Sequence, residues 1–124
     1  MELELNITYF KILKTIDLLN KENAFPNLLG LKKILKGEID EETSKFKDIL
    51  TFSTLISIGN RQLASNVKML IRYSYLRNIY DEESDDYFLK ITIKGENMIE
   101  SYEAHHKINY KKTTKKFKKT ILIK

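Results

Sequence analysis

The chain has 124 residues and a mass of 14.7 kDa, enough for one hydrophobic core and too little for a large multi-substrate enzyme. Hydrophobic residues make up 42% and charged residues 31%, which is a globular composition. The absence of cysteine excludes disulfides, thiolate nucleophiles and cysteine-ligated zinc. No apolar run approaches the about 18 residues of a membrane span. The acidic start, Met1–Leu5, is unlike a secretory signal, so we expect a cytoplasmic protein, nucleoid-associated if bacterial.

The net charge of +5 is unevenly distributed along the chain. Residues 1–106 contain 14 basic and 17 acidic residues, a net charge of −3, whereas residues 107–124 contain eight lysines and no acidic residue. Electrostatic attraction to nucleic acid is therefore expected to come first from the tail. We expect residues 1–104 to form one domain and residues 105–124 to form a basic C-terminal extension or linker.

The first half of the chain is predicted to be helical. Apolar residues recur at helical spacing over Asn6–Asn23, with Asn6 as the cap, and Pro26 marks a break. A second helix is predicted over Leu28–Lys36, with Gly37 as its C-terminal stop. A polar loop over Glu38–Ser44 follows. A further short helix is indicated by four apolar residues: Phe46, Ile49, Leu50 and Phe52.

The second half combines helices with a hairpin. Gly59–Asn60 opens a helix whose predicted buried stripe is Leu63, Val67, Leu70 and Ile71. Apolar and polar residues then alternate over residues 76–80 and 87–93, on either side of a charged turn at Asp81–Asp86, which predicts a β-hairpin. Thr92–Gly95 leads into a final helix that carries Met98, Ile99 and Tyr102.

This order of elements predicts a single α+β winged helix. Three to four helices form the core, a two-stranded β-hairpin forms the wing, and a C-terminal helix closes the domain. In nucleic-acid binders of this architecture the helix before the hairpin faces the duplex. Fold alone does not give function.

Four segments, in order and at matching spacing, resemble one family. Leu35-Lys36-Gly37 is similar to a Leu-Arg-Gly that ends the family's second helix, and Phe52-Ser53 stands where the family tends to have Tyr-Gly. Leu70-Ile71 followed by Ser74-Tyr75-Leu76 is similar to Leu-Ile followed by Gly-Tyr-Leu. Residues 89–95 are similar to Leu-x-Leu-Thr-x-Lys-Gly. The family is the RQC domain, the winged-helix module of RecQ-type DNA helicases, and the resemblance covers about residues 7–102.

The resemblance implies a non-catalytic accessory domain of a RecQ-like ATP-dependent DNA helicase. Such a domain is expected to be a monomer that holds duplex ends or forked DNA near the point of strand separation, with a motor domain in the same parent chain. The sequence also departs from the family. Phe52–Ile56 lacks both glycines and the lysine of the family's Tyr-Gly-x-Gly-Lys loop, and no four-cysteine zinc module is present. The turn Asp81–Asp86 has five carboxylates in six residues, which would repel a phosphate backbone.

Three groups of residues are candidate DNA contacts. The first lies on the helix before the hairpin and comprises Asn60, Arg61, Lys68 and Arg72, where Asn60 and Arg61 could donate to phosphates. The second is a strip of lysines, Lys32, Lys33 and Lys36. The third is in the tail and comprises Lys111, Lys112, Lys115 and Lys116, interleaved with aromatic residues. A solvated helix face fits the first two groups equally well, and a linker or a last strand fits the tail.

Two other functions remain open at this point. A free-standing winged-helix regulator that reads DNA needs a dimerisation element, and the only candidate, the Asn6–Asn23 helix, is already used by the core. A protein-interaction module using the same fold needs no DNA. No cofactor and no metal are expected, because His105 and His106 lack a surrounding ligand set and no catalytic constellation emerges. We also expect Tyr73, Tyr75, Tyr80 and Tyr87 to pack in the core and across the strands.

Overall fold

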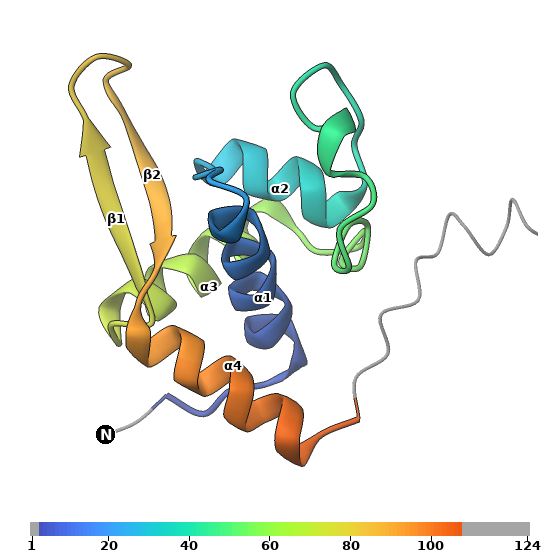
Figure 1. Cartoon of the computed structure of the whole chain (residues 1–124), viewed down its shortest axis with the longest axis vertical. Helices are drawn as coiled ribbons and strands as arrows, with labels where there is room; N and C mark the ends of the chain where they lie inside the picture. Colours follow the sequence, from blue (N-terminus) through green and yellow to red (C-terminus); the bar gives the residue numbers. More distant parts are fainter. Residues whose placement is uncertain (1–2, 108–124) are drawn as a thin grey trace, which may run out of the picture.

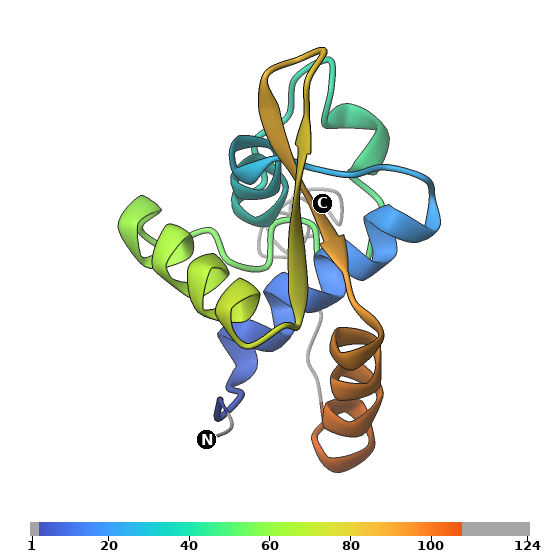
Figure 2. The same ribbon diagram turned by 90° about the vertical axis from the view of Figure 1, so that its left-hand side faces the viewer.

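A computed structural model describes residues 3–107 of the chain. They form four α-helices, one short 3₁₀-helix and one antiparallel two-stranded hairpin (Figures 1 and 2). The α+β class expected from the sequence is confirmed, and the layout is consistent with a winged helix. In chain order the elements are α1 (Ile7–Lys21), α2 (Leu28–Lys36), η1 (Ser44–Phe46), α3 (Asn60–Arg72), β1 (Leu76–Asp81), β2 (Asp86–Ile91) and α4 (Ile93–His105).

Helix α1 is the central element of the fold. As predicted, Asn6 caps its start by accepting a hydrogen bond from the Tyr9 N–H at 2.9 Å. Phe10, Leu13 and Ile16 are completely buried. The helix contacts α2, α3, α4 and β2, and both views show it enclosed by these elements (Figures 1 and 2). The apolar surface of α1 therefore belongs to the core of this chain.

Helix α2 has the bounds that the sequence predicts. The Asn27 side chain accepts from the Gly30 N–H at 2.8 Å and caps the start. At the other end Gly37 has a φ of 78°, the left-handed conformation that glycine adopts at little cost. Leu31 and Leu35 face the core.

The helix predicted around residues 46–52 is wrong. The structure has only the single turn η1, followed by turns up to residue 54. Two backbone hydrogen bonds explain the difference, because the Ser53 N–H donates to the Ile34 carbonyl at 2.8 Å and the Leu55 N–H donates to the Leu35 carbonyl at 2.9 Å. The residues that follow the segment thus donate to carbonyls in the last turn of α2, of which that of Ile34 also accepts from the Gly37 N–H at 3.2 Å. Leu50, one of the four apolar residues that suggested a helix, is 45% exposed.

The hairpin closes one side of the core. Its register pairs Leu76 with Ile91 at the base and Asp81 with Asp86 at the tip. Leu76, Leu89 and Ile91 are buried and seal the helical core. The outer edge of β2 is bound to the end of α1 and the following loop, because the Ile91 N–H donates to Asn20 Oδ1 and the Leu89 N–H to the Pro26 carbonyl, both at 2.8 Å.

Strand β2 ends at Ile91, two residues earlier than predicted. Ile93 was expected to continue the alternation of the second strand, but it begins α4 and is 75% exposed. The reason is Thr92, whose Oγ1 accepts from the Gly95 N–H at 2.9 Å and caps the helix. The same hydroxyl donates to the carbonyls of Ser74 and Tyr75, at 2.7 and 3.0 Å, and joins the base of the hairpin to α4.

Candidate nucleic-acid interface

Helix α3 presents a positively charged face to solvent. Arg61, Lys68 and Arg72 are seven and four residues apart, a spacing that places them on one side of a helix, and all three are exposed. The buried residues Leu63 and Val67 lie on the opposite side. Helix α3 contains no acidic residue, and none of the three cations pairs with a carboxylate of residues 3–107. We call Arg61, Lys68 and Arg72 the basic stripe, which extends about 16 Å along the helix axis.

The N-terminus of α3 is open at the same end. Gly59 is the N-cap and has no side chain, so no side chain caps the first turn. The N–H groups at the start of a helix have no intrahelical acceptor, and together with the helix dipole they favour an anion. Asn60 and Arg61 are exposed there, as the sequence predicts. The four predicted contacts on α3 are therefore all exposed on one helix, and Arg61, Lys68 and Arg72 share one side of it.

The lysine strip on α2 is weaker than the sequence indicates. Lys33 Nζ donates to Asp40 Oδ2 at 2.6 Å, which neutralises its charge locally. This bond raises the pKa of Lys33 and is the main reason that the pKa of Asp40 falls to about 2. Lys32 and Lys36 are half-buried and pair with no carboxylate of the described residues. Two of the three predicted cations on α2 thus remain available to an anion.

The loop before α3 uses three of its N–H groups, those of Ser53, Thr54 and Leu55, in hydrogen bonds within the fold. The two glycines of the family pattern are replaced by Ser53, which adopts a left-handed φ of 64°, and by Leu55. Ser53 and Leu55 donate to α2, and the Thr54 N–H donates to the Thr51 carbonyl at 3.2 Å. The loop therefore contacts the C-terminal end of α2, and these three N–H groups are not available to a ligand.

The wing carries an aromatic pair below an acidic tip. Tyr80 and Tyr87 are opposite in register, with ring centroids 5.1 Å apart, and both are about half exposed. Tyr80 Oη donates to Asp85 Oδ1 at 2.5 Å, which raises the pKa of Tyr80. Asn27 donates to Asp86 Oδ2 at 2.8 Å, which lowers the pKa of Asp86 and ties the tip to α2. The tip is thus a charged, internally hydrogen-bonded turn that repels a phosphate backbone.

The base of the wing holds three cations that the sequence reasoning missed. Arg77 and Lys90 are directly opposite in the register and both are exposed. They line a surface hollow with Lys94, the second residue of α4, and with the hydroxyl-bearing residues Ser74 and Thr92. No acidic residue lines this hollow. The turn predicted at Asp81–Asp86 was the one signal that could have paired Arg77 with Lys90, because a hairpin symmetric about this turn places the two residues opposite each other.

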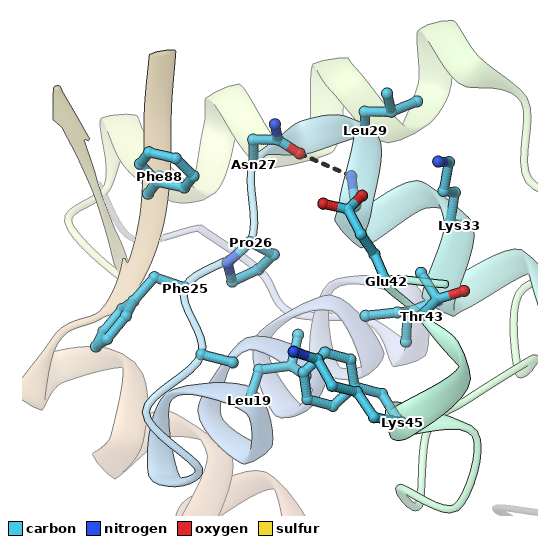
Figure 3. A pocket seen from close by; sticks show the side chains of 14 residues that line it. Leu19, Phe25, Pro26, Asn27, Leu29, Lys33, Glu42, Thr43, Lys45 and Phe88 are labelled. Carbon is cyan, nitrogen blue, oxygen red and sulfur yellow. Dashed lines mark hydrogen bonds between the residues drawn. The ribbon is translucent and has the colours of Figure 1, made fainter. Parts of the chain in front are cut away.

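A second hollow, the apolar hollow, is lined mainly by apolar side chains and also by three charged residues, Lys33, Glu42 and Lys45. It has a volume of about 230 Å³ and lies between the end of α1, α2, η1 and strand β2 (Figure 3). Figure 3 shows Phe25, Pro26 and Phe88 on one side and Leu29 of α2 on the other. Its remaining lining residues are Leu19, Ala24, Asn27, Gly30, Lys33, Ile34, Glu42, Thr43, Lys45 and Phe46. Phe25 and Leu29 are 39% and 54% exposed, which leaves apolar surface uncovered by residues 3–107.

The remaining candidate features are the two histidines, a metal site, a membrane span and the tail lysines. His105 and His106 lie at the end of α4, where their rings contact the Ser101 and Tyr102 carbonyls at 2.8 and 3.0 Å. Residues 3–107 contain no group of three His, Asp or Glu side chains that could hold a metal ion. Within the same residues no helix is long and apolar enough to cross a membrane. The tail lysines Lys111, Lys112, Lys115 and Lys116 lie outside the described residues.

No protein-family model matches the sequence, and a search of curated proteins finds no significant match.

Proposed function

We propose that this chain is a DNA-binding accessory domain of the RQC type, which holds duplex or forked DNA near the strand-separation point of a RecQ-like helicase. The observation that carries the proposal is the basic stripe. Its three cations are exposed and unpaired within residues 3–107, and they lie on the helix that precedes the wing. When a side-chain cation that pairs with no carboxylate contacts a DNA phosphate, it displaces salt counter-ions from the DNA, and their release favours binding.

Two backbone conformations support the resemblance behind the proposal. Ser53 and Ser74 stand where the RQC family tends to have glycine, and their φ angles are 64° and 69°. Only four non-glycine residues among residues 3–107 have a positive φ, so this coincidence is specific. Both chain turns therefore keep the left-handed geometry that a glycine accommodates best.

The charge distribution defines how DNA would approach. The acidic tip of the wing faces away from a phosphate backbone, so the duplex contacts α3 and the lower part of the hairpin. The tail adds a salt-dependent attraction without sequence preference. This mode needs no catalytic group in the domain, and ATP hydrolysis belongs to a motor domain elsewhere.

The test is fluorescence anisotropy with a forked duplex, a blunt duplex and a single strand, each over a salt series. The full chain is compared with Arg61→Gln/Lys68→Gln, with a tail variant in which Lys111, Lys112, Lys115 and Lys116 are replaced by Gln, and with a control, Lys45→Gln/Lys47→Gln. We expect structure-selective binding that survives in the tail variant and falls about tenfold or more in the α3 variant. Equal binding of the α3 and control variants would contradict the proposal.

The apolar hollow favours a second function, a protein-interaction module on the same fold. Exposed Phe25 and Leu29 beside buried Ile34 offer an anchor site for an apolar side chain. The same experiment separates the two functions. A module of this kind loses all DNA affinity when the tail lysines are replaced, because only the tail then attracts nucleic acid.

A further inference from the structure

Two like charges are opposed at the base of the wing. Arg77 of β1 and Lys90 of β2 are register partners, so their side chains leave the sheet on the same side. Both are exposed, and neither forms an ion pair with a carboxylate of residues 3–107. Like charges directly opposite each other destabilise an antiparallel pair. The pair therefore opposes folding of the hairpin unless an anion lies between the two side chains.

Lys94 adds a third charge at a fixed position. Its Nζ donates to the Tyr73 carbonyl at 2.9 Å and lies 4.8 Å from the centre of the Tyr75 ring. These contacts hold the ammonium group beside the hollow that Arg77 and Lys90 line. We call Arg77, Lys90 and Lys94 the wing-base cluster.

The carboxylates of a neighbouring hollow form no ion pair with Arg77 or Lys90. Glu96 and Asp17 line a neighbouring hollow that Lys90 also borders. Asp17 is paired with Lys21 at 3.0 Å, and no ion pair joins Glu96 to Lys90. The hollow around the wing-base cluster contains no acidic side chain, and its neutral polar lining includes Ser74, Asn78 and Thr92.

We propose that the wing-base cluster binds a phosphate group of the nucleic-acid backbone. This inference rests on the proposed function and extends it to three residues outside α3. Arg72 ends the basic stripe in the last turn of α3, and Arg77 follows five residues later, where α3, the hairpin base and α4 meet (Figures 1 and 2). We therefore expect one duplex to contact both groups, along α3 and the base of the wing below the acidic tip, and we call this path the track. A duplex on this track contacts the base of the wing and leaves the tip in solvent.

Charge variants of the full chain test the cluster. Arg77→Gln/Lys90→Gln removes two of the three cations that would bind the proposed phosphate, and Lys45→Gln/Lys47→Gln removes the same net charge at exposed positions around η1. For binding to a forked duplex, we expect the magnitude of the slope of log affinity against log salt to fall by about 0.9 relative to the control, since one neutralised phosphate contributes about that much. An unchanged slope, with binding still lost in Arg61→Gln/Lys68→Gln, overturns the wing-base site and leaves the proposed function standing.

A second variant separates binding from folding. Lys90→Glu places an acidic side chain opposite Arg77, so we expect the thermal midpoint to rise while DNA affinity falls by about tenfold or more. A fall in both quantities would indicate a folding defect and count against the inference. Inorganic sulfate provides a DNA-free readout, because it should raise the midpoint of the unmodified chain more than that of Arg77→Gln/Lys90→Gln at equal ionic strength. If the unmodified chain binds no DNA but shows this sulfate effect, the cluster is an anion site and both DNA proposals fail.

Discussion

Gly37 and Ser53 meet where the end of α2 contacts the loop before α3, and both have a left-handed backbone. Their φ angles are 78° and 64°. A Cβ at Gly37 would lie 2.6 Å from Ser53 Oγ and 2.9 Å from Ser53 Cβ, closer than real side chains approach. Ser53 Oγ is itself buried without a hydrogen-bond partner among the described residues. This junction therefore requires glycine at position 37, and Ser53 has a strained left-handed backbone.

The first prediction is that Gly37→Ala destabilises the protein by about 2 kcal/mol or more. The left-handed backbone alone costs about 1–2 kcal/mol for a residue with a Cβ. The clash with Ser53 adds to this cost. Urea unfolding followed by circular dichroism measures the change in the free energy of unfolding. A loss below about 0.5 kcal/mol would show that the loop moves away from α2 without cost.

The opposite substitution should stabilise the same junction. Ser53→Gly relieves the left-handed strain and removes a buried unpaired hydroxyl, and the added freedom of the unfolded chain offsets part of the gain, so we expect about +1 kcal/mol. In the double variant Gly37→Ala/Ser53→Gly the nearest Ser53 atom that remains is Cα, at 3.5 Å from the new Cβ. The two effects should therefore couple by at least about 0.5 kcal/mol. If the stability changes of the two single variants simply add up in the double variant, the contact between residues 37 and 53 is contradicted.

A third prediction concerns Gly95, where α4 begins against the hairpin. A Cβ there would overlap the Tyr75 carbonyl oxygen and lie 2.7 Å from Ile91 Cδ1. The Tyr75 carbonyl also accepts from the Thr92 hydroxyl, so it cannot move freely. Gly95→Ala should cost about 2–3 kcal/mol in urea unfolding. Gly30→Ala is the matched control. A Cβ added at Gly30 has its nearest neighbour 3.3 Å away, and alanine favours a helix more than glycine does. We therefore expect this variant to raise the free energy of unfolding by about 0–1 kcal/mol.

Local signals made most of the fold predictable. Asn6, Asn27 and Gly37 act on backbone groups within three or four residues, so the ends of α1 and α2 can be read from the sequence. The stretch at residues 46–52 has helical apolar spacing, yet hydrogen bonds between the following loop and the end of α2 decide its conformation. Such distant pairing leaves no periodic pattern, and the predicted helix was wrong for that reason.

The candidate site also contains a part that local sequence spacing predicts and a part that depends on contacts between distant residues. The basic stripe follows from spacing along one helix, which the sequence displays directly. The wing-base cluster depends on the pairing of Arg77 with Lys90 and on the start of α4 lying beside them, neither of which is local. Lys33 was predicted as a phosphate contact, but Asp40, seven residues away across a turn, binds it.

The Lys33–Asp40 pair yields a prediction about pH. The hydrogen bond from Lys33 is the largest cause that lowers the pKa of Asp40 from 3.8 to about 2, with the Thr43 N–H also contributing. A carboxyl whose pKa is depressed by folding stabilises the protein above its unfolded pKa, and this contribution disappears as the pH falls from about 4 to 2. NMR titration of the Asp40 side chain should give a midpoint near 2. In Lys33→Gln the midpoint should rise toward 3.8, and an unchanged midpoint would show that the pair does not form in solution.

The last prediction links the stability of α3 to its proposed role. Gly59 is the N-cap of α3, with φ and ψ of −75° and 151° and no atom within 4 Å of an added Cβ, so a capping side chain fits there. Gly59→Ser and Gly59→Asp should each stabilise the protein by about 0.5–1 kcal/mol in urea unfolding, because either side chain accepts from the open N–H groups of the first turn. Only Gly59→Asp adds negative charge beside Arg61. Its affinity for a forked duplex should therefore fall about tenfold relative to Gly59→Ser, equivalent to about 1.4 kcal/mol. Equal affinities of the two variants would mean that the N-terminus of α3 does not face the phosphate backbone.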